Sequence, residues 1–113
     1  MPCVTVTTDV KSIVSDPARA GRVMADAVSK ALGKPKQYIT VKIVPAAGVY
    51  VGGDEAGGVS VEIYSIGGGL KGTLCDGVYD TLEKEYGIKS DKAVVRFQNL
   101  NPAEYAMNGN TFA

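Results

Sequence analysis

The amino end of the chain carries the strongest candidate for chemistry. Pro2 follows Met1, and residues 4–7 alternate between valine and threonine, which predicts a β-strand. If Met1 is removed, which the small second residue favours, the ring nitrogen of Pro2 becomes a secondary amine that can act as a base or a nucleophile. The alternative is a proline that only begins a strand, where its missing N–H is tolerated. With Met1 retained, that nitrogen is an amide without basicity.

A second candidate is the glycine-rich run at residues 67–72, Gly-Gly-Gly-Leu-Lys-Gly. Glycines let a backbone approach a ligand closely, and a helix that follows would favour an anion at its N-terminus. The spacing fits neither the dinucleotide nor the phosphate-loop pattern, so a nucleotide site is rejected. The alternative is a plain turn between a strand and a helix.

Composition excludes several functional classes. The length of 113 residues suits a single domain, 1–113. The 12 basic and 12 acidic residues balance, so no strong electrostatic field favours binding to nucleic acid or to an anionic membrane. The chain has no histidine, the commonest metal ligand and general base, and no metal site is expected.

Cys3 and Cys75 lie outside any C-x-x-C motif, so a disulfide between them is allowed, but two reduced thiols are the better interpretation. Neither a signal peptide nor a membrane-spanning run is recognisable, and we expect a soluble cytoplasmic protein.

The first half of the chain predicts a strand, a helix and a second strand. Asp16 and Pro17 are typical of a helix start and Gly33 of a helix end, while residues 9–15 are predicted to form a polar loop. A strand is expected over Tyr38–Pro45. The apolar residues at helical spacing are Val23, Met24, Ala27, Val28, Ala31 and Leu32.

The second half repeats this order after a glycine-rich link at residues 46–58, in which a short strand is expected over 49–51. A strand is predicted over 59–66, a helix over about 70–86 and a last strand over 93–97. Gly87 would end the helix, and Gly72 and Gly77 inside it would let a neighbour pack closely. Leu74, Val78 and Leu82 mark its buried face.

Two βαβ units with right-handed crossovers predict an α+β fold: a four-stranded mixed sheet with two helices on one face, plus short edge strands. A turn is expected at residues 108–110. The uncovered face of the sheet and its two open edges favour an oligomer.

Several stretches resemble the macrophage migration inhibitory factor family, which includes D-dopachrome tautomerase. They are Met1-Pro2-Cys3 with Thr7-Thr8, Gly33-Lys34-Pro35-Lys36-Gln37-Tyr38, Val51-Gly52-Gly53-Asp54-Glu55, Ser65-Ile66-Gly67-Gly68, and Asn108-Gly109-Asn110-Thr111-Phe112. The resemblance covers the whole chain in the family's order. It implies a tautomerase fold assembled as a homotrimer, with active sites at subunit boundaries. It also implies keto–enol tautomerisation of phenylpyruvate-like or dopachrome-type substrates, with the amino-terminal proline as base and no cofactor.

The implied role of Pro2 is physically reasonable. A terminal amine has a reference pKa of about 7.7–8.0, and burial or a nearby cation lowers an amine pKa, so a useful fraction would be neutral at neutral pH. Lys34 matches the family's pocket lysine, which binds the substrate carboxylate and would stabilise an enolate. The alternative for Lys34 is a solvated side chain at a helix end.

The resemblance implies further substrate-binding residues. Ile66 matches a residue whose backbone N–H reaches the substrate, and Ser65 precedes it in the same matched stretch. Tyr38 and Phe112 match positions that line the pocket, although aromatic residues are more often simply part of a core.

Three positions depart from the family pattern. Val94 and Arg96 stand where the family commonly has a tyrosine and an asparagine that enter the neighbouring subunit's pocket. Val94 has no hydroxyl, whereas Arg96 could bind a carboxylate, block the pocket, or only form the polar side of a strand. Met107 replaces a near-terminal aromatic residue, so activity on the usual substrates could be shifted. The C-x-x-C motif of some members is replaced by residues 58–61, so thiol-oxidoreductase activity is not expected.

These departures leave a second functional hypothesis open. The protein would then be a cytokine-like or regulatory trimer that binds a protein receptor and keeps a weak or vestigial tautomerase pocket. A cytokine role would require secretion without a signal peptide.

Overall fold

The computed structural model describes residues 2–53 and 55–113, so Met1 and Asp54, which belong to two of the matched stretches, lie outside the described residues. Along the chain the elements are β1 (Cys3–Thr8), α1 (Lys11–Val14), α2 (Pro17–Leu32), the 3-10 turn η1 (Lys36–Tyr38), β2 (Thr40–Pro45), β3 (Val59–Ser65), α3 (Thr73–Tyr86), η2 (Ser90–Lys92), β4 (Ala93–Asn99), η3 (Pro102–Glu104), β5 (Ala106–Met107) and β6 (Asn110–Thr111).

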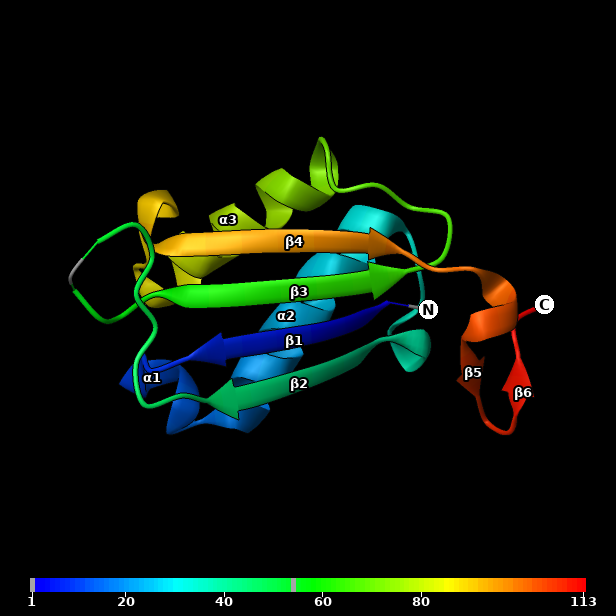
Figure 1. The fold of residues 1–113 in the computed structure, drawn as a ribbon, viewed down its shortest axis with the longest axis horizontal. Coiled ribbons are helices and arrows are strands. Elements are labelled where there is room, and N and C mark those ends of the chain that lie inside the picture. Colours follow the sequence, from blue (N-terminus) through cyan, green and yellow to red (C-terminus); the bar gives the residue numbers. More distant parts are fainter. Residues whose placement is uncertain (1, 54) are drawn as a thin grey trace.

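The four long strands form one mixed sheet in the order β2-β1-β3-β4 (Figure 1). β1 is parallel to β2 and β3 is parallel to β4, whereas the central strands β1 and β3 are antiparallel. Each parallel pair is connected through a helix, which confirms the predicted α+β architecture of two βαβ repeats. The short additional strands β5 and β6 pair with each other in a hairpin beyond the end of the sheet, and not along its edges.

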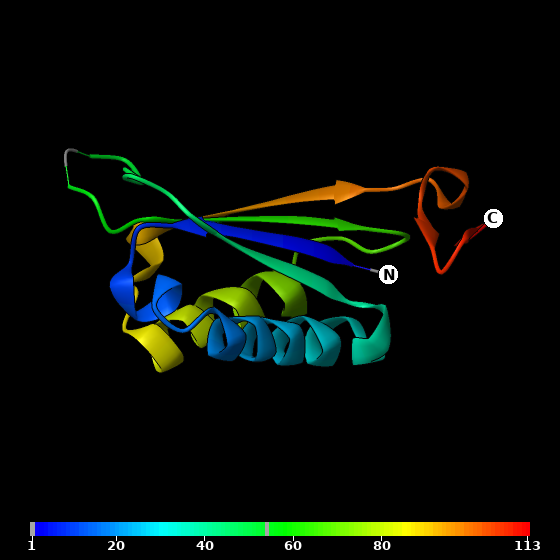
Figure 2. The same ribbon diagram turned by 90° about the horizontal axis from the view of Figure 1, so that it is seen from below.

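α2 and α3 lie side by side against one face of the sheet, as predicted (Figure 2). Strand residues that point toward the helices alternate with exposed or half-buried ones, as a one-sided sheet requires. The two helices approach closely, because a Cβ added to Gly77 would lie 3.7 Å from the Cβ of Ala31. The main core residues are Val4, Val6, Met24, Val28, Val61, Ile63, Leu74, Val78 and Leu82.

The helix ends follow the sequence signals. Asp16 caps α2 by accepting a hydrogen bond from the backbone N–H of Arg19 at 3.2 Å, and Pro17 occupies the first turn. Gly33 and Gly87 end α2 and α3 with left-handed φ angles of 66° and 67°. The left-handed conformation at Gly33 determines the direction in which the next residue, Lys34, leaves the helix.

Three local predictions were wrong. Residues 9–15 are not only a polar loop, because they include α1, whose Ile13 is buried in the core. The expected strand at 49–51 does not form; the carbonyl of Val49 instead accepts one loop hydrogen bond from Gly58. α3 begins at Thr73 and not near residue 70, since Gly72 has a φ of 94° that no helix interior allows.

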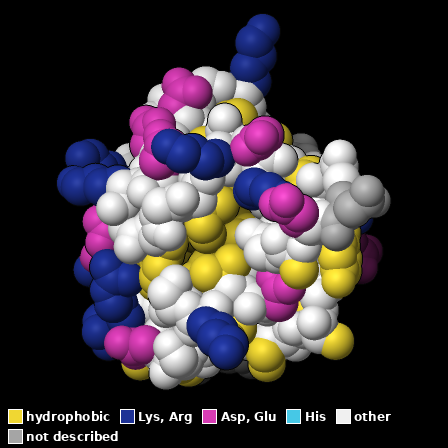
Figure 3. All heavy atoms as spheres, turned by 90° about the vertical axis from the view of Figure 1, so that its left-hand side faces the viewer, with side chains coloured by type: hydrophobic (Ala, Val, Ile, Leu, Met, Phe, Trp, Pro, Cys, Tyr) yellow, Lys and Arg dark blue, Asp and Glu magenta, His cyan; other side chains and the backbone are white. Residues whose placement is uncertain are grey.

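No helix formed by residues 2–53 or 55–113 lies over the second face of the sheet (Figure 2), and β2 and β4 form its edges. The end of the molecule that carries the 46–58 link shows apolar side chains in a shallow hollow with charged side chains around it (Figure 3). No helix in the described ranges is both long enough and apolar enough to cross a membrane.

Candidate functional site

Pro2 lies at the amino end of β1, a central strand, and its side chain is fully buried. Its carbonyl oxygen accepts a hydrogen bond from the backbone N–H of Thr40 at 3.0 Å, which continues the parallel pairing of β1 with β2. On the other side, Cys3 pairs with Tyr64, so the next step of the antiparallel register places Ser65 beside Pro2. The ring is therefore fixed between two strands, at the point where an amine would be oriented before any substrate arrives.

Lys34 reaches this same end of the sheet. Its half-buried ammonium donates to the backbone carbonyl oxygen of Ile66 at 2.8 Å and lies 3.4 Å from the hydroxyl oxygen of Ser65. Ser65 is fully buried. The structure therefore brings together Pro2, Lys34, Ser65 and Ile66, and the alternative of a freely solvated Lys34 is wrong.

The glycine-rich segment after β3 forms the edge of the site. Gly67 has a φ of 75° and donates its N–H to the side-chain oxygen of Asn99 at 2.8 Å. At Gly68 an added Cβ would lie 3.6 Å from both Leu32 and Phe97, so the backbone passes close to α2 and β4. In the structure Ile66 contributes its carbonyl oxygen to Lys34, and the role of its N–H toward a substrate stays a prediction.

Aromatic residues from three segments meet next to this end of the sheet. The rings of Tyr38 and Phe112 are 6.5 Å apart, and those of Tyr105 and Phe112 are 5.5 Å apart, both in edge-to-face geometry. Tyr38 and Phe112 also line a cavity of about 580 Å³, together with Gln37, Met107, Asn108 and Asn110. This cavity supplies an apolar wall of the kind that an aromatic substrate needs.

Tyr105 was not predicted as a site residue. A usable signal was present, because a two-residue turn at Asn108 and Gly109 fixes the hairpin register and pairs residue 105 with Phe112. The N–H of Phe112 indeed donates to the carbonyl oxygen of Tyr105 at 3.0 Å. Burial raises the pKa of the Tyr105 hydroxyl above its usual value, and the charge of the Cys3 thiolate raises this pKa further.

Val94 and Arg96 do not join this group within one chain. Both are exposed on β4, and an Nη of Arg96 lies 3.5 Å from a carboxylate oxygen of Glu62, its cross-strand partner. Arg96 is three residues before Asn99, which pairs with Ser65, so it lies roughly 10 Å back along the strand. Its predicted contact with a substrate would require a neighbouring subunit.

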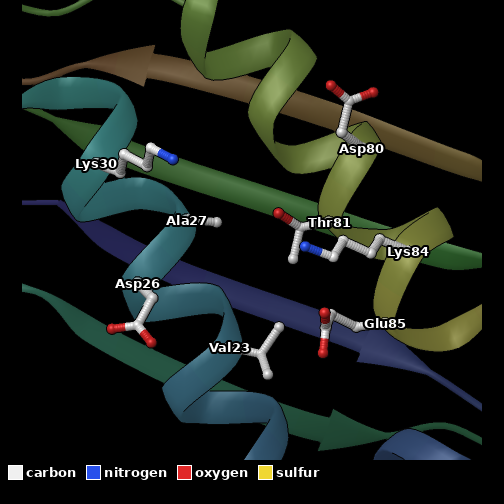
Figure 4. Close-up of a pocket in the computed structure, with 8 residues that line it drawn as sticks. All are labelled: Val23, Asp26, Ala27, Lys30, Asp80, Thr81, Lys84 and Glu85. Atoms are coloured by element: carbon white, nitrogen blue, oxygen red, sulfur yellow. The ribbon is translucent and has the colours of Figure 1, made fainter.

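A separate groove runs along the outer surface between α2 and α3 (Figure 4). Its volume is about 330 Å³, and charged side chains of both signs line it with the smaller Val23, Ala27 and Thr81. Those charged residues are Asp26, Lys30, Asp80, Lys84 and Glu85. It opens away from the sheet and from the contacts of Lys34 with Ser65 and Ile66, and contains no arrangement typical of catalysis.

Comparison with known proteins agrees with this geometry. The sequence profile described as macrophage migration inhibitory factor (MIF) matches residues 1–113. The chain belongs to the macrophage migration inhibitory factor family. Within this family it is 31% identical to the macrophage migration inhibitory factor of Xenopus tropicalis, over the full length of both chains. It is 30% identical to the MIF-like protein mif-2 of Caenorhabditis elegans, covering 80% of this chain and 78% of that one.

Solved structures of the family share the fold. The macrophage migration inhibitory factor of Trichinella spiralis superposes with a TM-score of 0.81 at 26% identity, covering 97% of this chain and 99% of that chain. That of Toxoplasma gondii has a TM-score of 0.82 at 24% identity, with the same coverage. The family resemblance inferred from the sequence is therefore confirmed, and so is its fold.

Proposed function

We propose that the protein is a cofactor-independent keto–enol tautomerase that acts on phenylpyruvate-like α-keto acids or on dopachrome-type substrates. The observation that carries this proposal is the contact of the Lys34 ammonium with Ser65 and Ile66 at the end of β3, where the register of β1 and β3 puts Ser65 next to the buried Pro2. A fixed cation beside a potential amine is the minimum that this chemistry needs, because the substrate is an anion and its reaction builds further negative charge.

The reaction would transfer one proton to Pro2 and return one proton to the substrate. With Met1 removed, the Pro2 nitrogen takes a proton from the carbon next to the keto group, and the electron pair of that C–H bond forms the C=C bond of an enolate. The keto oxygen then carries the charge and is protonated to the enol. Lys34 would bind the substrate carboxylate and stabilise the enolate, while the amine benefits from a rigid ring that needs no reorientation.

The aromatic group at the site fits the proposed substrate class. Tyr38 and Phe112 would line the pocket against a phenyl ring, with Met107 in place of a third aromatic residue. We further propose a homotrimer in which Val94 and Arg96 of an adjacent subunit complete the site. This assembly would cover part of the sheet face that carries no helix and pair the edge strands β2 and β4.

The decisive experiment compares three forms of the protein. Intact mass first establishes that the purified protein lacks Met1, and the ultraviolet decay of enol-phenylpyruvate then gives kcat/KM for this form, for Pro2→Gly, and for a form with one residue added before Pro2. The added residue converts the ring nitrogen to an amide without removing the ring. We expect both altered forms to lose more than about tenfold in rate, as is typical of the loss of a general base. Equal rates in all three forms would rule out Pro2 as the base.

A second candidate function is that of a regulatory or cytokine-like binding protein with a vestigial pocket. The pairing of Arg96 with Glu62 favours this reading, because it partly neutralises a cation that a substrate carboxylate would otherwise meet. Under this hypothesis a catalytically inactive Pro2→Gly protein would still bind its receptor stoichiometrically, and the unmodified protein would show no tautomerase activity above background.

A further inference from the structure

The backbone of Lys34 is held by one residue, Ser29, which lies in the last turn of α2. The hydroxyl of Ser29 donates to the carbonyl oxygen of Lys34 at 2.5 Å. The carbonyl oxygen of Ser29 accepts from the N–H of Lys34 at 3.2 Å and from that of Gly33 at 2.9 Å. Ser29 is therefore bonded to both polar groups of the Lys34 backbone, which leaves this residue little freedom to turn.

Only one of these contacts depends on the side chain at position 29. A helix that ends in a left-handed glycine forms the two backbone bonds whatever that side chain is. The carbonyl of Lys34, in contrast, lies beyond the end of α2 and precedes Pro35, which has no N–H to offer a neighbour. Within residues 2–53 and 55–113 the Ser29 hydroxyl is the sole hydrogen-bond donor to this carbonyl. The contact is thus a local addition to an ordinary helix end.

The far end of the Lys34 side chain is fixed as well. Its ammonium donates to the carbonyl oxygen of Ile66 at 2.8 Å and lies 3.4 Å from the hydroxyl oxygen of Ser65. An ammonium has three N–H donors, so one stays available for a ligand while both of these contacts are kept. The flexible stem of a lysine does not hold its charge in place by itself, and the direction of the third N–H depends on both ends of the side chain.

We propose that Ser29 is a positioning residue for the site: its hydroxyl fixes the backbone from which Lys34 reaches Ile66, so that the ammonium binds a substrate carboxylate without reorientation. The inference rests on the proposed tautomerase function and adds a residue that the family resemblance does not name. Ser29 acts through Lys34 and not by contact with the substrate. A cation that is already ordered loses less freedom when the anion binds, which strengthens binding.

Two probes of the same shape that differ in charge test the proposal without turnover. Titrations of the Met1-free protein followed by NMR give the dissociation constants of 3-phenylpropanoate and of the neutral 3-phenylpropanamide. We expect Ser29→Ala to weaken binding of the carboxylate by roughly threefold to tenfold, which is the worth of one hydrogen bond, and to leave the amide unchanged. Ser12→Ala, at an exposed serine of α1, is the matched control and should change neither constant.

A double-mutant cycle tests whether Ser29 acts through Lys34. Once Lys34→Ala has removed the ammonium there is nothing to position, so adding Ser29→Ala should weaken binding of 3-phenylpropanoate no further. Alanine is a better helix former than serine, and Ser29→Ala should therefore keep the helix content and the midpoint of urea unfolding. Ser29→Thr keeps the hydroxyl and should bind both probes as the unmodified protein does.

Each other result would overturn the proposal. An equal loss for both probes would mean that Ser29 only supports the shape of the pocket, and no loss for either would mean that its hydroxyl has no part in binding. The same loss in the presence of Lys34→Ala, or in Ser29→Thr, would break the link from hydroxyl to ammonium. Failure of both probes to bind the unmodified protein would remove the pocket itself. The proposed function fails differently, through equal rates of Pro2→Gly and the unmodified protein, a result that leaves both titrations intact.

Discussion

The Lys34 ammonium lies 2.8 Å from the backbone carbonyl oxygen of Ile66. This one contact ties the segment that follows α2 to the residue that follows β3. The cation is thus positioned by the fold and not by a ligand, because a left-handed glycine directs the chain out of the helix and a buried serine lies beside the ammonium. A substrate anion would meet a charge that is already in place.

Removal of this charge should reduce catalysis and leave the fold intact. For Lys34→Ala we expect kcat/KM for phenylpyruvate to fall by about tenfold to a hundredfold, which corresponds to a charged hydrogen bond of about 1.5–3 kcal/mol. Lys36→Ala is the matched control, since Lys36 pairs with Asp26 at 2.7 Å and both side chains are about 60% exposed. Equal rates for the two variants in the enol-decay assay would contradict a substrate role for Lys34.

The pair between Arg96 and Glu62 should matter for substrate affinity but hardly for stability. The two side chains are 65% and 38% exposed and 3.5 Å apart, and such surface pairs contribute less than about 1 kcal/mol. We therefore expect Arg96→Gln to leave the midpoint of urea unfolding unchanged while raising KM. Glu62→Gln should lower KM because it releases the guanidinium. If KM is unaffected in both variants, Arg96 takes no part in binding.

The Tyr105 hydroxyl should titrate above the usual pKa of a tyrosine, and Cys3 should account for the smaller part of the increase. Because the folded-state pKa is raised, the associated stabilisation is fully present below the unfolded pKa of about 10 and is lost as the pH rises through the folded value. In Cys3→Ser the pKa should move part of the way back, since burial of the phenol remains. Ultraviolet difference titration against Tyr105→Phe isolates this one tyrosine. A pKa unaffected by Cys3→Ser would show that the thiol does not act on the phenol.

The core between the sheet and α3 should be sensitive to cavities. Leu82 is 1% exposed, and its replacement by alanine should cost about 2–5 kcal/mol in the free energy of unfolding. Met107→Ala removes a side chain of similar size from a position that is 37% exposed, and should cost less than about 1 kcal/mol. Urea unfolding at one fixed protein concentration measures both. Similar losses in the two variants would contradict the described packing.

Local signals account for most of what could be predicted from the sequence. Asp16 with Pro17, and Gly33 and Gly87, each act through neighbouring backbone groups, so the ends of α2 and α3 that they mark were predicted correctly. Short elements were missed for a physical reason. α1 contains one buried apolar residue, Ile13, and four residues are too few to show a helical period.

The site was only partly predictable because most of it depends on tertiary contacts. Nothing within the sequence near Lys34 shows that its ammonium will meet a carbonyl 32 positions later. The family resemblance assigned Lys34 and Ile66 to one pocket but predicted no contact between them. Tyr105 was missed although the local hairpin register pairs it with Phe112. Its relation to Cys3 is a tertiary one, because the two residues are about a hundred positions apart in the sequence.

In each of the two repeats the helix ends at a glycine in the left-handed conformation. The residue after this glycine is Lys34 in the first repeat and Ile88 in the second. Ile88 is 7% exposed and belongs to the core. The internal duplication is thus a symmetry of the backbone and not of its electrostatics. A small anion would be attracted to the Lys34 ammonium where α2 ends. At the corresponding turn of the other repeat it would meet only the buried apolar side chain of Ile88, which offers no favourable electrostatic interaction.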